Sequence, residues 1–227
     1  MKQWFASLAQ AIPRYALTVA GVLALVLFVL LALLPLQIVH AHLSDAAYLK
    51  GLLVWAILAL LCFVPALSML IRKIWFFPGR AAPVASSQLR EELLALNRQD
   101  LPVRIQESGR ALVAQWRYDD PKWCELMDAS GIRRMLEMRL IFDETTHTIT
   151  IRDRFRRVNL ELCPVKVRPS LLAVPGVVFS VPPAGTRDSG LFQIRLPVDY
   201  TFRPREMKAP LTALILAQGW NVRYTLL

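Results

Sequence analysis

The chain has 227 residues, of which 55% are hydrophobic, and its formal net charge is +10. This composition excludes an acidic, disordered chain, because such chains lack the apolar residues that build a core. The three cysteines are too few for a disulfide framework, and no two of them form the C-x-x-C pair typical of zinc, iron–sulfur and thioredoxin sites, so we expect no cofactor and no metal centre.

Two uncharged, apolar segments account for the hydrophobic excess, at residues 15–39 and 51–71. A helix that crosses a membrane needs about 20 mostly apolar residues, and both segments meet that length. The apolar part of a signal peptide is shorter, and a buried helix of a soluble protein rarely reaches this length without a charge. We therefore predict transmembrane helices at 15–39 and 51–74, joined by an external loop at 40–50.

Basic residues near the ends of these segments determine the predicted orientation. Lys2 and Arg14 precede the first segment, and Arg72 and Lys73 follow the second, whereas the external loop carries a single basic residue. Lysine and arginine accumulate on the cytoplasmic side of membrane proteins. We therefore expect a multi-pass protein of a bacterial inner membrane, with residues 1–14 and the C-terminal part both in the cytoplasm.

Small side chains recur on one face of the first apolar segment, at Ala16, Ala20 and Ala24. Such a face lets another helix approach closely. We interpret it first as the packing surface between the two helices of the hairpin. Self-association of the protein through the same face is the alternative.

Residues 75–100 are predicted to form a linker and a helix. The aromatic residues at 75–77 are typical of anchors at a membrane interface. Residues 78–88 are rich in Pro, Gly, Ala and Ser, which is the composition of a linker. A helix is expected from Ser87, as its N-cap, to about Asn97.

The remaining residues, 101–227, have the size of one domain. Apolar and polar side chains alternate as in strands with one buried face, at 110–118, 135–143, 148–154 and 192–200. Weaker strand candidates lie at 158–162, 165–168, 177–181 and 220–226. Helices are expected at 121–129 and 204–218. The predicted fold class is therefore α+β: a two-helix transmembrane hairpin followed by a mainly antiparallel, β-rich cytoplasmic domain with two or three helices.

Paired carboxylates at Asp119 and Asp120 are the best candidates for catalysis. Such a pair can perform acid–base chemistry or bind a divalent cation, and His147 could assist. The same carboxylates also favour the start of a helix, and this is the interpretation we prefer. The domain cysteines, Cys124 and Cys163, are expected to be reduced in the cytoplasm. Because no catalytic motif accompanies these residues, the sequence favours a protein that is not an enzyme.

The clearest functional signal is basic. Residues 152–157 contain Arg152, Arg154, Arg156 and Arg157, and from residue 76 onward the chain has 22 basic and 16 acidic residues. Together with Arg72 and Lys73, these arginines are the predicted contacts with an acidic partner. An anionic membrane surface attracts such residues by about 1 kcal/mol each. Nucleic acid is not expected, because no aromatic platform or binding motif accompanies the charge.

We therefore interpret the protein as a membrane-anchored interaction or regulatory module whose basic cytoplasmic domain contacts anionic lipid or a protein partner. Two alternatives stay open. The first is a homo-oligomeric subunit of a membrane assembly, such as a pore or a secretion component, that packs through the alanine face. The second is a membrane-tethered enzyme that uses Asp119 and Asp120.

Overall fold

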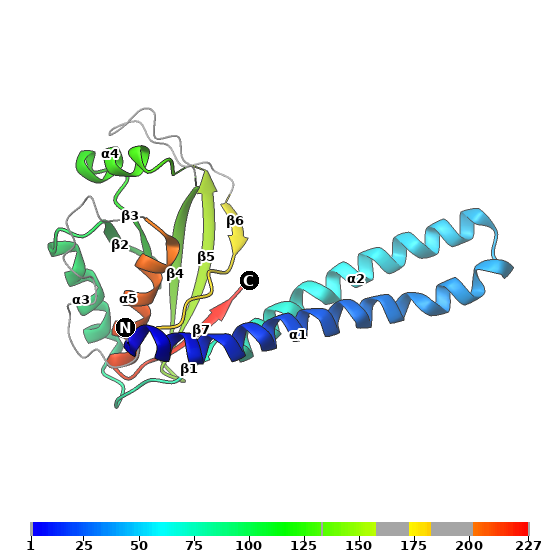
Figure 1. Cartoon of the computed structure of the whole chain (residues 1–227), viewed down its shortest axis with the longest axis horizontal. Coiled ribbons are helices and arrows are strands. Elements are labelled where there is room, and N and C mark those ends of the chain that lie inside the picture. Colours follow the sequence, from blue (N-terminus) through cyan, green and yellow to red (C-terminus); the bar gives the residue numbers. More distant parts are fainter. Residues whose placement is uncertain (1, 133, 158–172, 183–201, 227) are drawn as a thin grey trace. The chain divides into compact units, whose positions relative to one another are not determined.

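The computed structural model describes residues 2–132, 134–157, 173–182 and 202–226 (Figure 1). The chain divides into two compact units. One is Ile12–Ile74, the helical hairpin; the other comprises Met1–Ala11 and Trp75–Leu227, and its part from Trp75 onward is named the C-terminal domain. The described residues form an α+β protein, in which two long apolar helices precede a mixed sheet and shorter helices.

The hairpin is built from two helices, α1 (Lys2–Val39) and α2 (Asp45–Ile74). The stretches Pro13–His42 and Asp45–Ile74 are long and apolar enough to cross a membrane, and an 18-residue window within each has a mean hydropathy of 3.0 and 2.5, respectively. Most of their large apolar side chains are exposed, among them Phe28 at 69%. Burial within the protein therefore does not account for the apolar character of these helices.

The connection between the two helices is shorter than the loop expected at 40–50. A 3-10 turn, η1 (His40–His42), follows α1, and α2 already begins at Asp45. An acidic residue at a helix N-terminus complements the helix dipole, and the two alanines that follow Asp45 favour helix. These local preferences outweigh the polar composition that suggested a loop.

The two helices pack through a face of α1 that includes Thr18 and Gly21. Thr18 is buried, and a Cβ atom on Gly21 would lie 2.6 Å from Cδ2 of Leu70 in α2. The alanines of the predicted small-residue face are all exposed: Ala16, Ala20 and Ala24. The described contact between the two helices is thus made at Thr18 and Gly21, and packing through the alanine face stays a prediction.

The C-terminal domain combines a sheet with three α-helices in its described part. The strands are β1 (Phe76–Phe77), β2 (Val103–Ser108), β3 (Ala111–Trp116), β4 (Arg134–Asp143), β5 (Thr148–Arg157), β6 (Ala173–Gly176) and β7 (Asn221–Thr225). The helices are α3 (Ser86–Ala95), α4 (Pro121–Ala129) and α5 (Pro204–Ala217), with a 3-10 turn, η2 (Leu96–Arg98), after α3.

The sheet is mixed, with the strand order β1-β7-β5-β4-β3-β2. Every described pair of strands is antiparallel except β5 and β7, which run parallel. Residues 148–152 of β5 pair with β7, and residues 153–156 pair with β6. Parallel neighbours need a crossover connection, and α5 directly precedes β7. The strand β5 therefore lies at the centre of the domain.

Local sequence signals predicted several elements correctly. The helix α4 has the predicted bounds, because Asp120 accepts a hydrogen bond from the Lys122 backbone N–H at 3.1 Å and Gly131, just after the helix, has a φ of +67°. The strands β3, β4 and β5 confirm the alternation at 110–118, 135–143 and 148–154, and α5 and β7 confirm the last two elements.

Other sequence predictions were wrong or fall outside the described residues. Ser87 does not cap α3, which begins at Ser86 without a side-chain cap. Residues 177–181 are not a strand; β6 lies just before them, and β2 was not predicted because its alternation is short. The expected strands at 158–162, 165–168 and 192–200 lie outside the described residues.

Two of the three aromatic residues after α2, Trp75 and Phe77, belong to the domain core and are not membrane anchors. Trp75 is 0% exposed and stacks on Tyr224, with ring centroids 6.1 Å apart and ring planes at 8°. Phe77 is buried, and its strand β1 pairs with β7. The domain therefore begins at Trp75, one residue after α2 ends at Ile74.

The expected linker at 78–88 is also part of the domain. Its backbone N–H groups at Arg80 and Val84 donate to carbonyl groups at the end of α5 and just after it, at 2.8 and 3.1 Å. The indole N–H of Trp220 donates to the Val84 carbonyl at 2.8 Å. A Cβ atom on Gly79 would lie 2.2 Å from the backbone oxygen of Gly219, so the two segments touch through their backbones.

The domain core lies between the sheet and its helices, with α3, α4 and α5 on one side of the sheet (Figure 1). Fully buried side chains come from helices and strands alike, including Leu89, Leu93, Met127, Leu211, Leu112, Leu136, Met138, Ile149 and Val222. This face of the sheet supplies the apolar surface that the helices cover.

A buried ion pair joins α5 to the central strand. The side chains of Lys208 and Asp153 are 0% and 1% exposed; the Lys208 ammonium group is paired with Oδ2 of Asp153 and lies 3.7 Å from the ring centroid of Tyr224. The same carboxylate oxygen accepts a hydrogen bond from the Val178 backbone N–H at 2.7 Å. Burial lowers the pKa of Lys208, and the carboxylate opposes part of that effect.

We expect Lys208→Met to destabilise the domain by about 3–5 kcal/mol, because it leaves the Asp153 carboxylate buried without a counter-charge. Adding Asp153→Asn removes that charge while keeping an oxygen for Val178, so the double variant should recover most of the loss. Urea unfolding of the full chain in neutral detergent, followed by tryptophan fluorescence, measures both. Equal destabilisation in the single and double variants would contradict this account.

Candidate functional site

The basic segment predicted at 152–157 divides between the two faces of the sheet. Side chains alternate along a strand, so Ile151 and Asp153 point into the core, where they are 1% and 2% exposed. Arg152, Arg154 and Arg156 are half-buried on the opposite face, and the exposed Arg157 ends β5.

Neighbouring strands extend this basic surface. Arg139 of β4 lies directly opposite Arg152, and Glu137 lies opposite Arg154. Arg223 of β7 is on the same face, opposite Thr150 and 5.7 Å from the ring centroid of Phe76. We define the basic face by five arginines and the single carboxylate among them: Arg139, Arg152, Arg154, Arg156, Arg223 and Glu137.

The sequence analysis missed Arg139 and Arg223, which belong to other strands. Arg139 alternates with the buried Met138 and Leu140, so its side of β4 could have been predicted. Which residue it faces depends on the pairing of β4 with β5, and Arg223 reaches this face only because β7 runs parallel to β5. The surface is therefore a product of sheet topology.

Most of the positive charge on the basic face has no counter-charge in the described part of the chain. Glu137 accepts from Nε of Arg156 at 2.7 Å. No described side chain pairs with Arg139, Arg152 or Arg154. Nε of Arg139 and Nε of Arg152 are both buried, and neither has a hydrogen-bond partner in the part of the chain that the structure describes. Like charges directly opposite on a sheet cost roughly 0.2–1 kcal/mol, so this arrangement reduces stability unless an anion is bound.

Two other predicted contact residues lie in the helical hairpin. Arg72 and Lys73 are in the last turn of α2, where positive charge complements the helix dipole. They belong to a different unit from the basic face and are not part of it.

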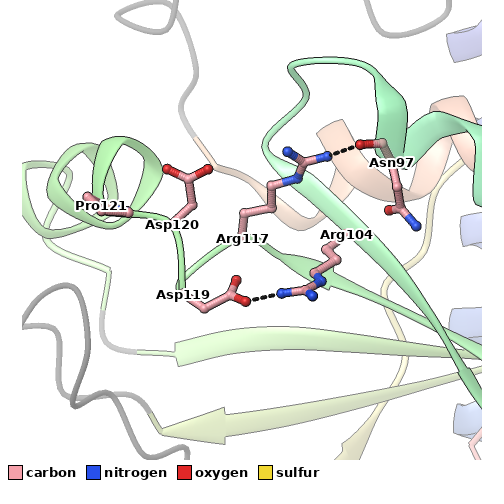
Figure 2. Close-up of a pocket in the computed structure, with 6 residues that line it drawn as sticks. All are labelled: Asn97, Arg104, Arg117, Asp119, Asp120 and Pro121. Atoms are coloured by element: carbon pink, nitrogen blue, oxygen red, sulfur yellow. Dashed lines mark hydrogen bonds and ion pairs between the residues drawn. The ribbon is translucent and has the colours of Figure 1, made fainter.

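The carboxylates proposed for catalysis line an open pocket with Asn97, Arg104, Arg117 and Pro121 (Figure 2). Asp119 forms an ion pair with Arg104, and both side chains are 44% exposed. Asp120 caps α4. The guanidinium group of Arg117 donates to the backbone oxygens of Asn97, Gln99 and Val103, at 2.7, 3.1 and 3.3 Å. Each charged group in this pocket thus has a structural partner.

His147 is not brought to this pocket. It lies in the turn between β4 and β5, at the opposite end of β4 from the helix α4 that Asp120 begins. Its ring packs edge-on against Trp220, with centroids 5.4 Å apart, and its φ is 45°. The described residues therefore contain no assembled group of Asp119, Asp120 and His147.

The cysteine of α4 is not a free thiol, and the described residues contain no metal-binding cluster. Cys124 is fully buried in α4 and disulfide-bonded, so the expectation of a reduced thiol at this position is wrong. Cys163 lies outside the described residues. Within the described part of the chain, no three His, Cys, Asp or Glu side chains lie close enough to hold a metal ion.

Comparison of the chain with known proteins gives no assignment. It matches no protein-family model, no curated protein and no solved structure. The functional roles considered for its residues therefore rest on the geometry described above. Of the two charged sites, the basic face has unpaired charge, whereas the pocket at Asp119 and Asp120 has its charges paired.

Asp120→Ala and Asp119→Ala test the structural roles assigned to these carboxylates. We expect Asp120→Ala to destabilise the domain by about 1 kcal/mol through loss of the helix cap. Asp119→Ala should cost at most a few tenths of a kcal/mol, because an exposed ion pair contributes little. Urea unfolding of the full chain in neutral detergent measures both. A cost for Asp119→Ala as large as for Asp120→Ala would show that Asp119 has a role beyond the exposed pair.

Proposed function

We propose that the protein is a membrane-anchored module whose C-terminal domain uses its basic face to contact anionic lipid headgroups. The observation that carries the proposal is the convergence of five arginines from three strands around one glutamate. Opposite charge on the partner would compensate the arginines that have no counter-charge in the described chain.

Three features support a membrane location for the hairpin. Its helices reach the length and hydropathy of membrane spans. Their apolar side chains are largely exposed, whereas soluble proteins rarely expose large contiguous apolar surfaces. Basic residues flank the spans at Arg14 and at Arg72 and Lys73, as expected beside a cytoplasmic surface.

The short connection between the units favours lipid over a soluble partner. Trp75 is a core residue of the domain and directly follows Ile74, the last residue of α2. A domain joined in this way stays beside the membrane surface. The negative surface potential acts within a Debye length of about 8–10 Å and attracts each nearby basic residue by about 1 kcal/mol. A lipid contact therefore needs no further recruitment step.

Two observations bear on the side of the membrane that the domain occupies, and they disagree. The basic residues that flank the spans favour the cytoplasm. The disulfide at Cys124 favours an oxidising compartment, because cytosolic thiols are mostly reduced. We place the domain in the cytoplasm. The basic residues that flank the spans act directly on how the helices insert into the membrane. Disulfide formation, in contrast, is a consequence of the compartment that the domain has reached.

This placement predicts that a green fluorescent protein fused after Leu227 will fluoresce in a bacterial host, whereas alkaline phosphatase fused there will be inactive. The reason is that the first reporter folds in the cytoplasm and the second needs an oxidising compartment for its disulfides. A variant with Arg14, Arg72 and Lys73 changed to Gln should weaken the bias. An active phosphatase fusion on the native chain would contradict the cytoplasmic placement and leave the disulfide at Cys124 explained.

Anionic lipid should stabilise the domain in the same bilayer, because a ligand that binds only the folded state raises stability. We expect the full chain to unfold at a higher urea concentration in nanodiscs that contain phosphatidylglycerol than in phosphatidylcholine nanodiscs. The gain should be about 2–3 kcal/mol at low salt. The variant Arg152→Gln/Arg154→Gln/Arg156→Gln should lose most of it.

A matched control keeps the loss of charge equal. Arg98, Arg110 and Arg203 are exposed and lie outside the sheet strands, so Arg98→Gln/Arg110→Gln/Arg203→Gln should retain the lipid-dependent gain. High salt should weaken the gain in the native chain. Equal stability of the native chain in the two kinds of nanodisc would overturn the lipid proposal and leave an acidic protein as the partner to seek.

A further inference from the structure

At the centre of the basic face, two arginines form a defined cross-strand pair. Arg139 and Arg152 lie directly opposite each other on adjacent antiparallel strands. Side chains in this relation have Cβ atoms about 4.5–5.5 Å apart, so the two guanidinium groups can reach one ligand together. The residues that flank this pair on the next strands are uncharged: Val113 of β3 lies beside Arg139, and Thr225 of β7 lies beside Arg152.

The two guanidinium groups lie close against the surface of the protein. Both residues are half-buried, and the Nε atom of each is buried with no hydrogen-bond partner among the described residues. The terminal nitrogens are not enclosed in this way. A partly desolvated charge gains more from an opposite charge than a solvated one, because less water screens it. The terminal nitrogens are therefore well placed to donate to an anion.

Arg154 adds a third positive charge two positions along β5. It has no side-chain partner in the described chain, whereas the neighbouring carboxylate of Glu137 is held by Arg156. The three arginines that have no counter-charge among the described residues thus form one cluster: Arg139, Arg152 and Arg154. Their combined charge favours a small anion with more than one negative charge.

We infer that this arginine cluster is a binding site for a phosphate monoester dianion. A carboxylate has one charge and two coplanar oxygens, which a single guanidinium group can satisfy in bidentate fashion. A phosphate monoester carries close to two charges at neutral pH and offers three oxygens in a tetrahedral arrangement. It can accept hydrogen bonds from two facing guanidinium groups at once. Inorganic phosphate and the headgroup of phosphatidic acid share this chemistry.

The inference rests on the proposed anion-binding role of the basic face, but it predicts a different response to Arg→Lys substitution. Lysine keeps the charge but cannot donate through a planar fork of N–H groups. The variant Arg139→Lys/Arg152→Lys should therefore keep its stabilisation by phosphatidylglycerol and lose specific phosphate binding.

The test uses the full chain in a non-ionic maltoside detergent, in buffer free of phosphate. Inorganic phosphate, titrated at constant ionic strength against chloride, should bind saturably by isothermal calorimetry and raise the urea midpoint. Arg139→Lys/Arg152→Lys should weaken binding at least tenfold, and the control Arg98→Lys/Arg110→Lys should not change it. Glu137→Gln should bind phosphate several-fold more tightly, because it removes the carboxylate of the basic face while leaving the paired arginines in place.

The two sources of phosphate are separated in nanodiscs. Phosphatidic acid should stabilise the native chain more than phosphatidylglycerol at equal surface charge if a lipid headgroup occupies the site, whereas an equal effect with saturable phosphate binding assigns it to free phosphate. Absence of saturable phosphate binding by the native chain would overturn the site. So would equal binding by the native chain and a folded Arg139→Lys/Arg152→Lys variant. In either case, phosphatidylglycerol should still stabilise the native chain. If phosphatidylglycerol did not stabilise the native chain, the proposed function itself would be contradicted.

Discussion

Asp153 and Lys208 form an ion pair inside the domain core, and β5 can place Asp153 there in only one register. A shift of one residue would turn Asp153 toward the opposite face and bring Arg152 or Arg154 under α5. A buried guanidinium group without a partner would then replace a compensated pair, at a cost of several kcal/mol. The same alternation that buries the carboxylate therefore fixes which side chains form the basic face.

The pairings of β5 carry this constraint into the rest of the domain. The strand β7 runs beside it in parallel, β1 pairs with β7, and Trp75 stacks on Tyr224, whose ring also lies under the Lys208 ammonium group. Trp75, the first core residue after α2, is thus in contact with Tyr224, the aromatic residue that the buried Lys208 contacts. The first residue after α2 is thus already part of the domain core.

Capping residues and side-chain alternation predicted those helices and strands whose ends are determined by residues nearby in the sequence. Asp120, Pro121 and Gly131 were sufficient to define α4, and alternation was sufficient for β3 to β5. Composition was a poor guide at 78–88, because a segment rich in Pro, Gly and Ala looks the same whether or not its backbone bonds to α5. The run at 152–157 was found as a charge cluster, and the alternation predicted at 148–154 already implies that Arg152 and Arg154 share one face. That Arg139 faces Arg152 depends on the strand pairing.

The buried pair also bears on how the arginine cluster would bind an anion. Because Asp153 alternates with Arg152 and Arg154 on one strand, any sliding or twisting of β5 that reoriented these arginines would strain the contact of Asp153 with Lys208 and Val178. The backbone beneath the cluster is thus held from the core side, while like-charge repulsion acts only between the side chains above it. An anion would relieve that repulsion by small rotations of the guanidinium groups. Anion binding would then require no rearrangement of the sheet, which would otherwise lower the affinity.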